Sequence, residues 1–114
     1  MKNSAYILDW TMNDYDNLKF KLKNSGFEFE KAEKEHIRVT VPFNKIDSFV
    51  DIVQVHLNAP QNYVDVQFPD EKKSIVIFQA KKFVITNDKE NEKVKEWAIS
   101  IGLPTEQADW KTSY

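Results

Sequence analysis

The sequence of 114 residues contains no cysteine, which excludes three kinds of protein chemistry at once. Disulfide scaffolds, thiol nucleophiles and cysteine-based zinc sites all require a thiol. Glycine is also scarce, with two residues in all, so a glycine-rich loop that cradles a phosphate is excluded. No G-x-S-x-G motif marks a serine as a nucleophile. We therefore expect no catalytic residue, no metal site and no cofactor.

Long hydrophobic runs are absent as well. The first ten residues, MKNSAYILDW, lack the apolar stretch of a signal peptide, and no segment reaches the length of a membrane span. We therefore expect a cytoplasmic protein that does not act at a membrane.

Neither sign of charge is in large excess, because 16 basic and 18 acidic residues give a net charge of −2. Nucleic-acid-binding proteins normally carry a basic surplus, so we expect no nucleic-acid partner. Arginine is nearly absent: Arg38 is the sole arginine, and every other basic residue is a lysine. A planar guanidinium holds a carboxylate or phosphate in fixed geometry better than an ammonium does, which makes Arg38 a residue of interest.

The most apolar stretch is SIVIFQAKKFVIT, residues 74–86, and we expect the fold to be organised around it. Apolar residues run without interruption at 75–78 and again at 83–85. β-branched and aromatic residues favour strands, and a strand that is apolar on both faces lies in a sheet covered on both sides. The stretch therefore predicts a β-hairpin at the centre of the core.

Hydrophobic periodicity predicts six strands and three helices. Alternating or two-sided apolar patterns place the strands at residues 5–10, 27–30, 36–41 and 63–68 and in the two halves of 74–86. Apolar stripes of helical period place the helices at residues 14–25, 45–57 and 88–101. Residues suited to N-terminal capping precede them: Asn13 or Asp14, Asn44, and Asn87 or Asp88. In the first strand, we expect Tyr6, Leu8 and Trp10 to face the helices.

This order of elements predicts an α+β fold in a single domain, residues 1–114. Its first six elements have the ferredoxin-like β-α-β-β-α-β order, in which two helices cover one face of a mainly antiparallel sheet. We expect the hairpin to extend that sheet beside strand 63–68 and the C-terminal helix to cover the second face of the hairpin. Residues 103–114 are expected to form an irregular C-terminal tail with one helical turn at 105–109.

The polar face of the predicted sheet is the first candidate site for a ligand or partner. His36, Arg38 and Asp65 lie on it together with further carboxylates, and such a set is suited to binding or to acid–base chemistry. The alternative is a solvated face on which opposite charges pair across strands. For Arg38 we predict a cross-strand pair with Glu28 or Glu30.

Two aromatic residues near the end of the sequence, Trp110 and Tyr114, form the second candidate site. Either they fold back over the sheet, or they anchor a partner, as tryptophan and tyrosine often do at interfaces. His56, beside the apolar stripe of the second helix, lacks the neighbours at the spacing of a metal-binding motif.

These absences favour a small non-enzymatic protein-binding or regulatory module of the inhibitor, immunity or adaptor type, with a protein partner or self-association. The alternative is a small-molecule-binding protein or a small enzyme that uses the face around His36, Arg38 and Asp65. A pocket at that face, with the His36 ring nitrogens pointing into it, favours the alternative; a flat, self-paired face favours the module. RNA binding on the sheet ranks last, because the middle strand carries no exposed aromatic residue.

Overall fold

The computed structural model describes residues 2–110 and 112, which form three α-helices and a six-stranded antiparallel sheet. The strands are β1 (Ser4–Leu8), β2 (Glu28–Ala32), β3 (His36–Thr40), β4 (Tyr63–Phe68), β5 (Lys73–Phe78) and β6 (Lys82–Ile85). The helices are α1 (Tyr15–Asn24), α2 (Ile46–His56) and α3 (Asp88–Ser100). Three short 3₁₀ turns join them: η1 (Asp9–Thr11), η2 (Phe43–Lys45) and η3 (Thr105–Gln107). The predicted α+β class is confirmed.

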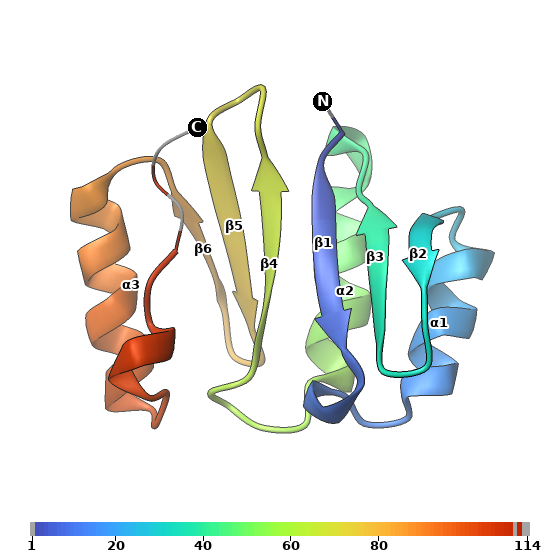
Figure 1. Ribbon diagram of the computed structural model, residues 1–114, viewed down its shortest axis with the longest axis horizontal. Helices are drawn as coiled ribbons and strands as arrows, with labels where there is room; N and C mark the ends of the chain where they lie inside the picture. The colour runs from blue at the N-terminus through green and yellow to red at the C-terminus, as the bar shows by residue number, and fades with distance from the viewer. Residues whose placement is uncertain (1, 111, 113–114) are drawn as a thin grey trace.

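The strands follow the order β2-β3-β1-β4-β5-β6, and each neighbouring pair is antiparallel. In Figure 1, α1 and α2 lie behind the half of the sheet that contains β1, β2 and β3, whereas α3 lies beside β6 at the opposite end. The β5–β6 hairpin extends the sheet beside β4, as the sequence predicts.

Two hydrophobic clusters lie on opposite faces of the sheet, and β5 contributes to both. Ile75 and Ile77 belong to the larger cluster with α1 and α2, whereas Val76 and Phe78 belong to the smaller cluster with α3. Alternate residues of a strand point to opposite faces, so a strand with a helix layer on each side needs apolar residues at every position. This is the physical reason for the uninterrupted apolar run that dominates the sequence.

Side-chain caps define the start of two of the three helices. The Asp14 carboxylate accepts a hydrogen bond from the backbone N–H of Asn17, and Asn87 caps α3 in the same way. The predicted cap at Asn44 is wrong, because Asn44 lies inside η2 and α2 begins without a side-chain cap. The backbone bond from Lys45 N–H to the Pro42 carbonyl closes η2, so a 3₁₀ turn leads directly into the helix.

The first strand faces the opposite way from our prediction. Ala5 and Ile7 are buried against the helices, whereas the Tyr6 side chain is 48% exposed on the other face. Both alternating sets of this strand contain apolar residues, so the pattern alone does not choose a face. The pairing with β3 decides it, because it places Ile7 opposite Ile37 and Tyr6 opposite Arg38.

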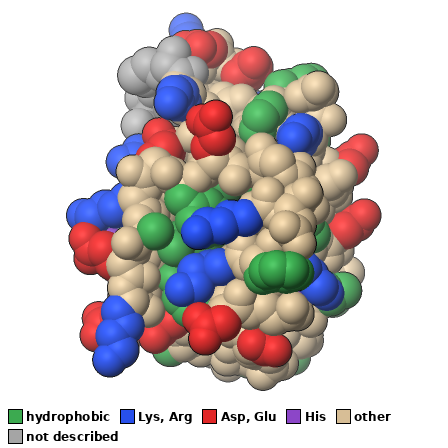
Figure 2. Space-filling model, turned by 90° about the vertical axis from the view of Figure 1, so that its right-hand side faces the viewer, with side chains coloured by type: hydrophobic (Ala, Val, Ile, Leu, Met, Phe, Trp, Pro, Cys, Tyr) green, Lys and Arg blue, Asp and Glu red, His purple; other side chains and the backbone are tan. Residues whose placement is uncertain are grey.

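Charged side chains of both signs are mixed on the side of the molecule that carries α1 and the edge strand β2 (Figure 2). Glu28, Glu30 and Lys31 are exposed on this edge strand, where charges oppose pairing with another sheet. None of the described helices combines the length and the apolar composition that a membrane crossing requires.

Candidate functional site

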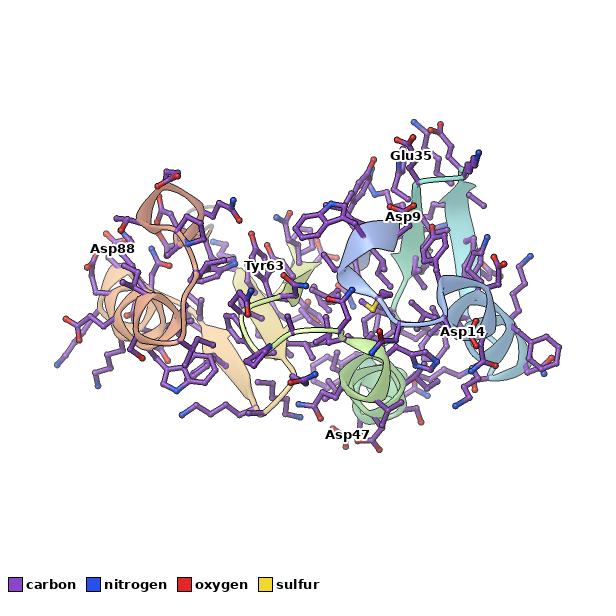
Figure 3. The ribbon with its side chains drawn as sticks, turned by 90° about the horizontal axis from the view of Figure 1, so that it is seen from below. Asp9, Asp14, Glu35, Asp47, Tyr63 and Asp88 are labelled. Carbon is purple, nitrogen blue, oxygen red and sulfur yellow. The ribbon has the colours of Figure 1, made fainter. Side chains whose placement is uncertain are left out.

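The second face of the sheet, opposite α1 and α2, is covered over only part of its width. α3 and residues 103–110, which we call the C-terminal segment, pack on β4, β5 and β6. On β1 and β3 the same face carries exposed side chains such as Tyr6 and Arg38. Figure 3 looks along the sheet and shows Tyr63 near the middle, between the α3 side and the η1 side that carries Asp9.

A pocket of about 530 Å³ lies at the boundary between these two parts of the face. Its floor is formed by β1 and β4, and its walls by η1, the loop before β4 and the C-terminal segment. The lining residues include Tyr6, Trp10, Arg38, Tyr63, Asp65 and Trp110. The strands explain the opening, because β1 pairs with β4 only through Ser4 and Ala5 and is unpaired with it beyond them.

Arg38, Tyr6 and Asp65 lie on three successive strands, β3, β1 and β4, and all three line the pocket. Tyr6 pairs with Arg38 of β3, and Asp65 lies next to Val66, the β4 residue that pairs with Ala5. A guanidinium and a carboxylate therefore flank an aromatic ring on the floor.

The Asp65 carboxylate is incompletely hydrogen-bonded. Its Oδ2 lies 3.4 Å from Nε2 of Gln67, and its Oδ1 is shielded from solvent with no hydrogen-bond partner among residues 2–110 and 112. Burial raises the pKa of Asp65 to about 6, although the hydrogen bond from Gln67 acts in the opposite direction. A carboxyl group shifted in this way inside a concave site is typical of functional positions.

Tyr63 and Trp110 form the aromatic wall beside Asp65. Their ring centroids are 5.4 Å apart and the planes meet at 80°, an edge-to-face arrangement. Burial, and secondly the charge of Asp65, raises the pKa of the Tyr63 hydroxyl above its usual value. The indole Nε1 of Trp110 is buried without a partner in the described part of the chain. Two residues that line the pocket thus each carry a buried polar atom without a partner in the described part of the chain.

Arg38 has the partner that we predicted for it. Its Nε lies 3.6 Å from Oε2 of Glu30, and the same oxygen accepts a hydrogen bond from the Ser4 hydroxyl at 2.8 Å. The Arg38 side chain is 54% exposed and also lines the pocket. Arg38 therefore closes a cross-strand pair and stands at the pocket rim.

His36 lies on the same sheet face but outside the pocket. Its ring stacks on Tyr6 at a centroid distance of 4.9 Å, and its Nε2 is 3.3 Å from Oε2 of Glu33. This contact is not a hydrogen bond, so ring stacking is the interaction that holds His36 on the face, while the face is concave around Asp65. The structure brings Arg38, Asp65 and Trp110 together in one pocket and leaves His36 beside it.

Of the two residues proposed near the end of the sequence, Trp110 folds back over the sheet and is 6% exposed, while Tyr114 lies outside the described residues. His56 is buried between helices: its Nδ1 is 2.7 Å from the Ile52 carbonyl, and its Nε2 is 3.3 Å from Nδ2 of Asn17. No group of three or more histidine or acidic residues suited to a metal ion occurs in the described part of the chain.

Sequence reasoning did not assign a site role to Tyr6, Trp10 or Asn91. Tyr6 and Trp10 were expected to face the helices. The pairing of β1 with β3 turns Tyr6 to the other face, and Trp10 lies in η1, where it lines the pocket. Asn91 of α3 is buried and holds the C-terminal segment in place. The sequence offered one signal for Asn91: it is a polar residue on the otherwise apolar stripe of α3.

Comparison with known proteins adds no functional information. The sequence matches no protein-family model, and no curated protein or solved structure shows significant similarity to it. The geometry of the pocket is therefore the basis for the proposal that follows.

Proposed function

We propose that this protein is a binding protein that holds a small molecule in the pocket between β1, β4 and the C-terminal segment. The observation that carries the proposal is the Asp65 carboxylate, which lies in a pocket of about 530 Å³ with one oxygen unpaired. Pockets of this size, lined by aromatic groups and a few convergent polar groups, are typical of small-molecule sites. A solvated sheet face with paired charges has neither a pocket nor an unpaired carboxylate oxygen.

A protein partner is the second candidate. The residues that line the pocket include three exposed hydrophobic ones, Tyr6, Leu8 and Trp10, of which Trp10 is 63% exposed. Exposed aromatic residues next to a pocket are common anchors at protein interfaces, which supports a protein-binding module of the kind that the sequence favours. The structure adds the pocket, and for this reason we place the small molecule first.

For the fold, we propose that β1, α1, β2, β3, α2 and β4 form a ferredoxin-like unit that the β5–β6 hairpin and α3 extend. The strand order β2-β3-β1-β4 and the packing of α1 and α2 in one cluster on one face support this assignment. In this view, the added elements supply the wall that converts an open sheet face into a pocket.

A fragment screen monitored by amide correlation NMR tests the proposed function. We expect binding fragments to shift signals of β1, β4 and the C-terminal segment, including the indole signal of Trp110. Tyr6→Ala should weaken this binding, whereas Phe20→Ala, which removes a similarly exposed ring from α1, should leave it unchanged. A screen whose hits all map away from the pocket, or that has no hits, contradicts the proposal.

A further inference from the structure

Of the three charged residues that line the pocket, Arg38 and Asp109 have a partner of opposite charge within 4 Å and Asp65 has none among the described residues. Arg38 pairs with Glu30 at 3.6 Å. Asp109 accepts a hydrogen bond from Nδ2 of Asn91 at 2.8 Å and lies 3.9 Å from Nζ of Lys95. Asp65 has no cationic partner in the part of the chain that the structure describes. The uncompensated charge of the pocket is therefore negative and lies at Asp65.

The surroundings of Asp65 suit a positive charge for a second reason. Tyr6 and Tyr63 line the same floor and wall, and Trp10 stands at the rim. The face of an aromatic ring carries negative electrostatic potential and attracts ammonium and guanidinium groups within about 6 Å. A carboxylate in a pocket that aromatic residues also line offers both the counter-ion and the apolar contact that an organic cation requires.

We propose that the ligand of this pocket is a small organic amine or amidine, whose charged nitrogen binds Asp65 and whose apolar part contacts Tyr6 and Tyr63. This inference rests on the function proposed above and adds the chemical class of the ligand. An N–H donor from such a cation satisfies an oxygen of Asp65, and ion-paired hydrogen bonds of this kind are about twice as strong as neutral ones.

Three probes of similar size and different charge test the inference on the full chain: benzylamine, benzyl alcohol and benzoate. Titration at about pH 7.5, followed by amide correlation NMR, should show benzylamine binding in the pocket about tenfold more tightly than the other two. Asp65→Asn should remove this preference. Asp47→Asn, on α2 and away from the pocket as Figure 3 shows, is the matched control and should keep the preference.

A second measurement on the unmodified protein keeps the test valid even where Asp65→Asn disturbs the fold. Benzylamine remains charged between about pH 5 and pH 7.5, whereas Asp65 takes up a proton near pH 6. The other charged or titratable residues at the pocket are Tyr6, Arg38, Tyr63 and Asp109, and none is of a type that ordinarily titrates within this interval. Histidine is of such a type, and His36 stacks on Tyr6 just outside the pocket, so the same titration of His36→Gln is the control. Benzylamine should therefore bind about tenfold more weakly at about pH 5.

The two proposals fail in different ways. Pocket binding of benzyl alcohol or benzoate as tight as that of benzylamine overturns the cationic ligand. A preference that survives both Asp65→Asn and acidification overturns the role of Asp65 as its counter-ion. Either result leaves the small-molecule site standing. Pocket signals that respond to none of the probes and to no fragment of the screen overturn both.

Discussion

Asn91 of α3 holds the backbone of Trp110, 19 residues further along the chain: its Oδ1 accepts a hydrogen bond from the Trp110 N–H at 3.1 Å. The same side chain donates to the Asp109 carboxylate, so one buried amide fixes two consecutive residues. Trp110 in turn packs on Tyr63 and Phe78. A single residue of the helix therefore positions the aromatic wall of the pocket.

Asn91→Ala should loosen this wall. It leaves the buried N–H of Trp110 without an acceptor, so we expect the free energy of unfolding to fall by about 1–3 kcal/mol. Urea denaturation measures the loss, and amide hydrogen exchange at residues 108–110 should accelerate. Asn24→Ala, at an exposed position of α1, is the control and should change stability by less than about 0.5 kcal/mol. Unchanged exchange at Trp110 would show that other contacts hold the segment.

Asp65→Asn should stabilise the protein at neutral pH. The pKa of Asp65 rises from an ordinary 3.8 to about 6 on folding, so the folded state binds the proton more tightly than the unfolded state. The free energy of unfolding therefore falls as the pH rises through this interval and stays lower above it. We expect Asp65→Asn to gain about 1–3 kcal/mol at about pH 7.5 and much less near pH 4. Urea denaturation at the two pH values is the measurement, and a variant that is less stable at neutral pH contradicts the prediction.

Ile77→Ala should be strongly destabilising, because Ile77 is fully buried in β5 against α2. Large-to-small substitutions at such sites cost about 2–5 kcal/mol, through lost burial and the cavity that remains. Chemical denaturation measures the loss, with Val84→Ala on the exposed face of β6 as the control at under about 1 kcal/mol. A loss below about 0.5 kcal/mol at Ile77 would mean that the hairpin is not central to the core.

Arg38→Lys should change the free energy of unfolding by less than about 1 kcal/mol, because its pair with Glu30 is long and the side chain is about half exposed. Fragment binding in the pocket should survive, since the guanidinium is already paired. Thermal denaturation and the NMR titration described above check both parts. If the fold stays intact and binding disappears, Arg38 contacts the ligand directly and the ligand also carries an anionic group.

The sequence by itself determined the elements and the two-sided core. The apolar run of β5 has no alternation, and this requires a layer on each face of the hairpin, which α2 and α3 provide. Asp14 and Asn87 mark the starts of their helices because capping is a local interaction over three residues. The sequence also predicted that Arg38 pairs with Glu28 or Glu30, because a short turn joins their strands.

Only the tertiary structure decided which face β1 presents and where the pocket lies. Tyr6 and Ile7 are both apolar enough for the core, and pairing with β3 and β4 chooses between them. The pocket exists for two reasons. β1 is not paired with β4 beyond Ala5, and a hydrogen bond from the Trp110 N–H to Asn91 holds Trp110 against Tyr63 of β4. Both are long-range relationships between residues far apart in sequence, and no local propensity or periodicity encodes the distance at which such segments meet.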